Sequence, residues 1–211
     1  KEGNANSRYF HMHARYRKRK NLVTVLREGE NVITNQHEKA SLVDQFYSNL
    51  IGKAENRDRT IDLAALGLPT HNLSPLDDPC SELEVWNAVR SLPSDKAPGP
   101  DGFTGRFYKE CWAIIKEDIL QAVLAVWSRN FVNLEKLNAA YIIMLPKKAG
   151  ADQVQDFRPI SLVHSFAKLV TKILANRLSP LLSSLVSTNQ SAFVRGRCIH
   201  DNFILVQQTV K

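Results

Sequence analysis

The stretch that decides the fold is DFRPISL, residues 156–162, a short extended run that carries one arginine among apolar neighbours. Shortly upstream, the apolar run 139–146 also has strand character and ends in Lys147 and Lys148. Two such runs joined by a polar loop predict a two-stranded hairpin. Pro159 cannot donate to a strand ladder, which places the second strand at a sheet edge or a bulge.

The cations of this hairpin have a chemistry in common. Arg158 offers a rigid fork of donors that matches phosphate oxygens, and Lys147 and Lys148 supply mobile positive charges at the loop mouth. The arrangement therefore predicts a clamp for a phosphate-rich ligand, either a nucleotide or a nucleic acid. The alternative is an ordinary hairpin with solvated surface cations.

Around the hairpin the sequence is mostly helical. Apolar periodicity predicts helices over about 6–20, 36–51, 81–92, 112–127 and 164–179, and a last one after 197. Ser81 and Glu84 form a capping-box pattern at the start of the third helix. The run 22–27 is predicted to pair with residues 32–33 across a turn at Gly29. The fold class is therefore α+β and rich in helix.

Composition suggests two regions. Residues 52–79 are polar, with prolines near their end, and are typical of a linker. We therefore expect a basic helical N-terminal extension with its linker over 1–79, and a second domain over 80–211.

The positive charge is concentrated near the start of the chain. The net charge is +7, and residues 1–20 hold seven cations against the single acid Glu2: Lys1, Arg8, Arg15, Arg17, Lys18, Arg19 and Lys20. Such a cluster attracts polyanions by counterion release. Arg15, Arg17, Lys18 and Arg19 are therefore candidate nucleic-acid ligands. A solvated helix face and a nuclear import signal remain open.

Two later features also carry cations. Arg177 falls inside the apolar stripe of the helix 164–179, so it either forms a structural ion pair or contacts a ligand. The loop NQSAFVRGR, residues 189–197, combines an amide, an aromatic ring and two arginines around Gly196, which suits RNA or DNA contact. A solvated surface loop is its alternative. The turn at 98–102 is a rigid connector or a place of close approach to a nucleic-acid backbone.

Other classes of protein are not indicated. The three cysteines are scattered, which favours a reducing compartment. No secretion signal or membrane-spanning run is present, so we expect a protein of the nucleus or cytoplasm. No phosphate-binding glycine-lysine loop, zinc-binding histidine pair or nucleophile elbow occurs. The carboxylates Asp101, Asp152, Asp156 and Asp201 lie in or beside turns, so no metal site is predicted. The absence of an initiating Met suggests a fragment.

Four motifs follow one another along the chain: KAPGPDGF at 96–103, the hairpin motif within 141–162, LANRL at 174–178, and the block from Asn189 to Asn202. In this order they resemble the reverse transcriptase of plant LINE-type (non-LTR) retrotransposons. The stretch from Arg8 to Asn21 is similar to the region between endonuclease and polymerase domains in such proteins. The resemblance covers nearly the whole chain.

The resemblance implies an incomplete right-hand polymerase fold, comprising the fingers and the start of the palm. It implies that Arg158, together with Lys147 or Lys148, contacts the incoming dNTP. Gln190, Phe193, Gly196 and Arg197 would lie near the template and the nucleotide pocket, and Arg177 would join them if it contacts a ligand. Arg195 stands where the family often has proline.

The resemblance also implies what the full-length protein does. It would be an RNA-directed DNA polymerase, a nucleotidyltransferase acting on an RNA template, a DNA primer and dNTPs, with Mg²⁺ held by aspartates on later palm strands. Those positions are absent here, so the chain alone is expected to be inactive. An endonuclease domain upstream would fit the same family. The alternative function is a non-catalytic RNA-binding module from a degraded or domesticated element.

Overall fold

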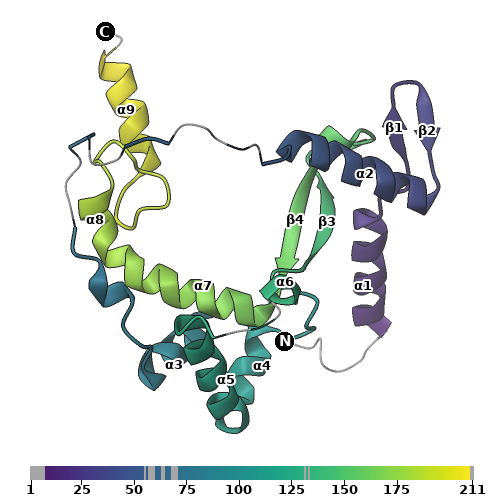
Figure 1. Ribbon diagram of the computed structural model, residues 1–211. Helices are drawn as coiled ribbons and strands as arrows, with labels where there is room; N and C mark the ends of the chain where they lie inside the picture. The colour runs from purple at the N-terminus through teal and green to yellow at the C-terminus, as the bar shows by residue number, and fades with distance from the viewer. Residues whose placement is uncertain are drawn as a thin grey trace. The chain divides into compact units, whose positions relative to one another are not determined.

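The structure is a computed structural model that describes residues 8–54, 56, 60–62, 65–67, 71–130, 132 and 134–209 (Figure 1). The predicted helix start at Asn6, the cation Lys1 and residues 55, 57–59, 63–64 and 68–70 of the predicted linker lie outside these residues.

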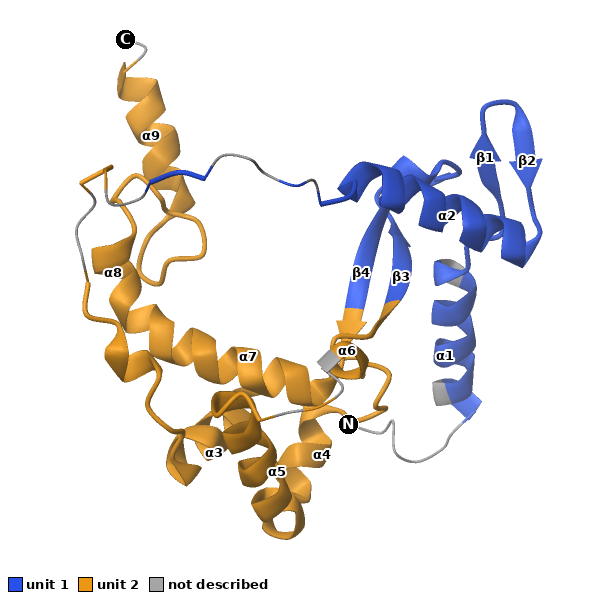
Figure 2. Cartoon of the chain, in the orientation of Figure 1, with its two compact units in different colours: residues 1–62, 142–161 blue, residues 63–141, 162–211 orange. Residues whose placement is uncertain are grey.

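The chain forms two compact units (Figure 2). Unit 1 comprises residues 1–62 and 142–161, and unit 2 comprises residues 63–141 and 162–211. Most of the predicted hairpin thus packs with the N-terminal segment rather than with residues that neighbour it in sequence. The functional assignment of 1–79 as an extension and 80–211 as fingers stays a prediction, because these units are defined by packing alone.

Unit 1 begins with the predicted helices and hairpin turn, but its first strand is shorter than the predicted run 22–27, since residues 22–25 are not part of it. Helix α1 spans Arg8–Asn21, strands β1 (Leu26–Glu28) and β2 (Asn31–Ile33) pair antiparallel, and helix α2 spans Gln36–Ile51. Gly29 takes a positive φ of 61° in the turn between the strands, a conformation that favours glycine. The Asn35 side chain caps α2 by accepting from the His37 backbone N–H at 2.8 Å.

The predicted hairpin completes unit 1. Strands β3 (Ala140–Pro146) and β4 (Phe157–Val163) form a two-stranded sheet, and a short 3₁₀ turn, η3 (Val154–Asp156), precedes β4. Leu26, Val154 and Phe157 are buried together, with Val43, Phe46 and Met144 among the side chains packed around them. The core of unit 1 thus joins β1 to the hairpin across more than half of the chain.

Unit 2 is helical. Its helices are α3 (Glu82–Ser91), α4 (Gly105–Glu110), α5 (Trp112–Trp127), α6 (Leu134–Leu137), α7 (Ser165–Leu178), α8 (Leu182–Leu185) and α9 (Ile199–Thr209), with 3₁₀ turns η2 (Ser74–Leu76) and η4 (Ser179–Leu181). Ser81 caps α3 by accepting from the Glu84 backbone N–H at 3.2 Å.

The core of unit 2 lies where α3 packs against α7 (Figure 1). Val85, Val89, Leu169 and Ile173 are fully buried there. Cys80 is also buried at the edge of this core, and burial raises the pKa of its thiol to about 11.

The 98–102 turn packs on the start of α7. A Cβ at Gly99 would clash with the backbone carbonyl of Val163, so only glycine fits there. Asp101 accepts from the Ser165 backbone N–H at 2.6 Å and so caps α7 from a distant part of the sequence. The glycine-rich turn is therefore a structural connector in unit 2.

The predicted fold class is confirmed: the described residues are rich in helix and carry two small two-stranded sheets. The assignment to the fingers and early palm of a right-hand polymerase remains a prediction. Among the described helices, none combines the length and the apolar character needed to cross a bilayer.

Candidate nucleic-acid interface

The loop between β3 and β4 fixes both of its lysines. The Lys147 backbone N–H donates to the Asp156 carbonyl at 2.8 Å, and its Nζ donates to the Gln155 carbonyl at 2.6 Å. Lys148 Nζ lies 2.9 Å from Asp156 Oδ1. This hydrogen bond raises the pKa of Lys148 and lowers that of Asp156, so both groups stay charged at neutral pH.

Arg158 lies on the exposed side of β4. Its neighbour Phe157 is buried in the core of unit 1, and successive side chains of a strand point to opposite faces. The guanidinium therefore faces away from that core, and within the described part of the chain it has no hydrogen-bond or ion-pair partner. It is available to a ligand.

A cleft of about 740 Å³ in unit 1 collects several of the cations. It is lined by the segment 21–25, which connects α1 to β1, by Arg27, and by residues 146–152 and Phe157. Lys147 and Lys148 thus share one cleft, whereas Arg158 is not among its lining residues. That all three cations contact one triphosphate stays a prediction.

Arg27 is a cleft residue that the sequence did not single out. Its Nε lies 2.9 Å from Asp152 Oδ2, and its backbone N–H donates to the Asp152 carbonyl at 2.6 Å. These two contacts hold β1 against the hairpin loop. Nothing in the local sequence pairs residues so far apart, so no sequence signal could have found it.

Helix α1 ends at the rim of the same cleft, since its last residue, Asn21, is part of the lining. The predicted ligands Arg15, Arg17, Lys18 and Arg19 are all exposed on this helix. None of these four side chains forms an ion pair with another described residue. The basic extension and the hairpin, which sequence reasoning placed in separate domains, therefore lie in one unit.

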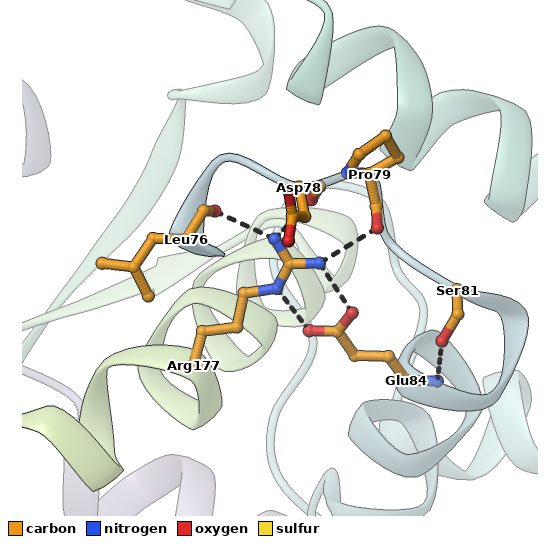
Figure 3. Close-up of polar contacts among 6 residues, drawn as sticks. All are labelled: Leu76, Asp78, Pro79, Ser81, Glu84 and Arg177. Atoms are coloured by element: carbon orange, nitrogen blue, oxygen red, sulfur yellow. Dashed lines mark hydrogen bonds and ion pairs between the residues drawn. The ribbon is translucent and has the colours of Figure 1, made fainter. Parts of the chain in front are cut away.

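Arg177 forms the structural ion pair that the sequence left open (Figure 3). Its Nε and Nη2 donate to the Glu84 carboxylate at 2.6 and 2.7 Å. Its remaining donors reach the backbone carbonyls of Leu76, Asp78 and Pro79. All five N–H donors of the guanidinium are thus used.

The surroundings of Arg177 strengthen this structural role. The guanidinium lies 4.8 Å from the centre of the Trp127 ring. Its hydrogen bonds lower the pKa of Glu84, and the carboxylate raises the pKa of Arg177 in return. A template contact by Arg177 would have to break these bonds, so that assignment stays an untested prediction.

The loop 189–197 is held from inside by Arg197. Its guanidinium donates to the carbonyls of Ser187 at 2.5 Å, Gln190 at 2.7 Å and Val186 at 3.2 Å. Phe193 is fully exposed, with a φ of 64° that is uncommon for a residue with a side chain. Arg197 therefore positions the loop, and Phe193 is the predicted ligand that the loop presents.

The other two predicted residues of this loop shape its backbone. Gln190 Nε2 donates to the Ala192 carbonyl at 3.2 Å, and Gly196 has a φ of 83°. Both are compatible with a loop that is ordered before any ligand arrives. Their contact with a template is not tested by this geometry.

The four aspartates that the sequence singles out are engaged in other contacts or lie at a helix end, whereas a two-metal site needs at least two acids that converge on the ions. Asp101 accepts backbone N–H groups, Asp152 pairs with Arg27, and Asp156 pairs with Lys148. Asp201 lies in the first turn of α9. In the described parts of the chain, no three histidine, cysteine or acidic side chains gather in a way that could hold a metal ion.

Comparison with known proteins finds similar sequences in mobile elements. No protein-family model matches it. It is 28% identical over 165 residues to the transposon TX1 149 kDa protein of Xenopus laevis, covering 77% of this chain and 12% of that protein. In Drosophila melanogaster it is 25% identical over 182 residues to the probable RNA-directed DNA polymerase from transposon BS, covering 80% of this chain and 19% of the relative.

A third relative agrees with these two. The Pol polyprotein of the type-2 retrotransposable element R2DM of Drosophila melanogaster is 31% identical over 102 residues, covering 45% of this chain and 9% of that protein. The homologues of this chain are non-LTR retrotransposon proteins. The resemblance inferred from the four motifs is thereby confirmed at the level of LINE-type elements, while a plant origin is not shown.

As a homologue of non-LTR retrotransposon proteins, the chain spans only about a tenth to a fifth of the length of these relatives. The names of these relatives describe transposon proteins, a polymerase and a Pol polyprotein. What the whole protein binds and catalyses therefore has to be argued from this chain's own residues.

Proposed function

We propose that this chain is the part of a retrotransposon RNA-directed DNA polymerase that binds template RNA and the incoming dNTP. The observation that carries the proposal is the cleft of unit 1, where Lys147, Lys148 and Arg27 line a space of about 740 Å³ at the end of the basic helix α1. Names of the relatives support the reaction class, and the charge supports a polyanionic ligand.

Each of the three predicted dNTP-binding cations has a distinct part in this proposal. The ammonium groups of Lys147 and Lys148 are held at fixed positions, because a backbone carbonyl and a carboxylate accept hydrogen bonds from them. Arg158, free of partners among the described residues, would supply a bidentate contact to phosphate oxygens. Together they would orient a triphosphate or a template phosphate and offset part of its charge.

Catalysis would need groups that the described residues do not supply. Mg²⁺ would neutralise the phosphates and activate the primer hydroxyl in a polymerase, but Asp101, Asp152 and Asp156 are already engaged in other contacts in this chain. We therefore expect this chain to bind RNA without extending a primer by itself. The DNA primer and an upstream endonuclease domain remain expectations for the full-length protein.

Salt-dependent RNA binding tests the proposal. We expect the 211-residue chain to bind a labelled RNA oligonucleotide with an affinity that falls steeply as salt rises. The variant Lys147→Gln/Lys148→Gln should bind more weakly, and its log–log salt slope should be smaller by about 0.7 for each phosphate that the variant no longer neutralises. Fluorescence anisotropy across a salt series measures both quantities.

The matched control removes two charges elsewhere. Arg90 and Lys136 are exposed and have no ion-pair partner among the described residues, so Arg90→Gln/Lys136→Gln lowers the net charge equally. Its salt slope should equal that of the wild-type chain. If both double variants lose the same affinity, the cleft is not the binding site.

A non-catalytic RNA-binding module is the second candidate, because the exposed cations Arg15, Arg17, Lys18 and Arg19 of α1 suit RNA binding without any catalysis. Both candidates predict RNA binding, so binding alone does not separate them. Primer extension by the full-length protein on an RNA template does. Extension supports the polymerase, whereas tight RNA binding with no extension supports the module.

A further inference from the structure

Helix α1 carries an aromatic stripe that net charge alone does not explain. Tyr9, Met12, His13 and Tyr16 follow the spacing i, i+3, i+4 and i+7, which places them on one face. Tyr9 is 72% exposed, Met12 60% and Tyr16 65%. On a helix that packs against protein such side chains would be covered, whereas here most of the surface of each is exposed.

An arginine row runs beside this stripe. Arg8, Arg15 and Arg19 share a face, and Met12 lies four residues after Arg8 and three before Arg15, so the two rows are neighbours. The helix contains no acidic residue at all. An occupant of this double row must therefore present negative charge next to flat apolar surface.

The ring of Tyr9 is held in place on the helix. Its hydroxyl lies 3.0 Å from Nε2 of His13, and the two rings meet edge to face with centres 4.8 Å apart. A tyrosine that is already oriented loses less freedom when a flat partner stacks on it. This contact therefore favours stacking over a loose surface position.

Unpaired RNA has the chemistry that fits. Its phosphates are regularly spaced and its bases expose their flat faces, whereas bases in a duplex are stacked on each other and hidden in A-form grooves. Aromatic side chains that interleave with cations are typical of proteins that bind single strands. The phosphates of a duplex would contact the arginine row, but its bases could not stack on Tyr9 and Tyr16.

We propose that α1 recognises unpaired RNA, with Tyr9 and Tyr16 stacking on bases while Arg8, Arg15 and Arg19 contact phosphates of the same strand. The proposal rests on the proposed function, since it names the form of RNA that the chain prefers. It also gives the exposed tyrosines a role that a purely electrostatic helix would not require.

The test compares two RNAs of equal length, an unstructured strand and a perfect hairpin, for binding to the 211-residue chain. We expect Tyr9→Ala/Tyr16→Ala to weaken binding of the unstructured strand by about tenfold per tyrosine and to leave the hairpin nearly unaffected. Tyr9→Phe/Tyr16→Phe should retain most of the affinity, because a phenyl ring still stacks. Arg15→Gln/Arg19→Gln should weaken both RNAs.

Two further readouts complete the test. A 2-aminopurine base in the unstructured strand should lose fluorescence on binding to the wild-type chain, and less so with the double alanine variant. Circular dichroism should show unchanged helix content, since alanine is a strong helix former.

The outcomes separate this proposal from the proposed function. If the tyrosine variant binds both RNAs like the wild type while the arginine variant binds neither well, the stacking role is wrong and RNA binding stands. If the wild-type chain binds no RNA, the proposed function itself fails. Tighter binding to vesicles of anionic lipid, abolished in the same variants, would identify a membrane surface as the occupant and overturn the proposal.

Discussion

At the scale of single residues, Arg177 shows how a cation on the apolar side of a helix is accommodated. Its side chain is 12% exposed, and every donor is matched by an oxygen from α3 or from the segment 76–79. The helical position predicted that such a cation must be paired or must meet a ligand. It could not predict Glu84, because that partner lies 93 residues away in sequence.

We expect Arg177→Ala to lower the free energy of unfolding by about 2–3 kcal/mol, because it leaves the half-buried Glu84 carboxylate without its partner. Urea unfolding followed by circular dichroism measures the change. The double variant Arg177→Ala/Glu84→Gln should recover part of the loss. If it recovers nothing, the pairing itself contributes little.

The same pair predicts a pH dependence. The pKa of Glu84 is lowered in the folded chain, so its contribution is complete above its ordinary pKa, near 4.5, and is lost as pH falls through the lower folded-state pKa. Stability of the wild-type chain should therefore fall more steeply below about pH 4.5 than that of Glu84→Gln. Parallel pH profiles for the two chains would contradict this assignment.

Arg158 is the exposed arginine of β4 for which we propose a contact with the dNTP. We expect Arg158→Ala in the full-length protein to raise the KM for dNTP with a smaller effect on kcat, because the guanidinium would bind phosphate oxygens in ground and transition states alike. Steady-state primer extension measures both constants. Arg90→Ala serves as control, and an unchanged KM for Arg158→Ala would count against the dNTP role.

At the scale of elements, helices were predictable where periodicity and end signals agree. Helix α2 follows the cap Asn35, and α5 runs between two tryptophans with apolar side chains at helical spacing. The hairpin β3–β4 followed from two apolar runs joined by a polar loop. The packing of that hairpin against β1 was not predictable, because it depends on contacts between distant segments.

The 98–102 turn offers a test at this scale. We expect Gly99→Ala to destabilise the chain by about 2 kcal/mol or more, because a methyl group there meets the backbone of Val163. Gly102→Ala should cost only about 1–2 kcal/mol, since Gly102 has open space around it and a positive φ of 71°. Chemical unfolding of both variants compares the two effects. Equal losses would mean that the close approach of Gly99 is not what fixes the turn.

At the scale of the whole molecule, the two cores share no buried residue. Leu26, Val154 and Phe157 form one, and the other lies between α3 and α7 in unit 2. The chain passes from unit 1 to unit 2 after residue 62, returns to unit 1 for residues 142–161 of the hairpin, and then enters unit 2 again. The change in composition near residue 79 could not predict that residues 142–161 pack with residues 1–62, because that packing depends on contacts between distant segments.

We expect Leu26→Ala to cost about 3 kcal/mol in unit 1 and to raise hydrogen exchange in residues 142–161, although they are far away in sequence. Helices α3 and α7 should keep their protection. Val89→Ala should do the reverse. Hydrogen exchange read by mass spectrometry follows both units at once, and a uniform rise in either variant would show that the units unfold together.

Because Cys80 is buried, the modification of its thiol can report on opening of the core of unit 2. Thiolate is the form that reacts with alkylating reagents, so a thiol with a pKa of about 11 stays inert while the α3–α7 core is closed. Cys198, which is exposed, should be labelled first. The rate at which Cys80 is modified then measures how often the α3–α7 core opens, without any added probe.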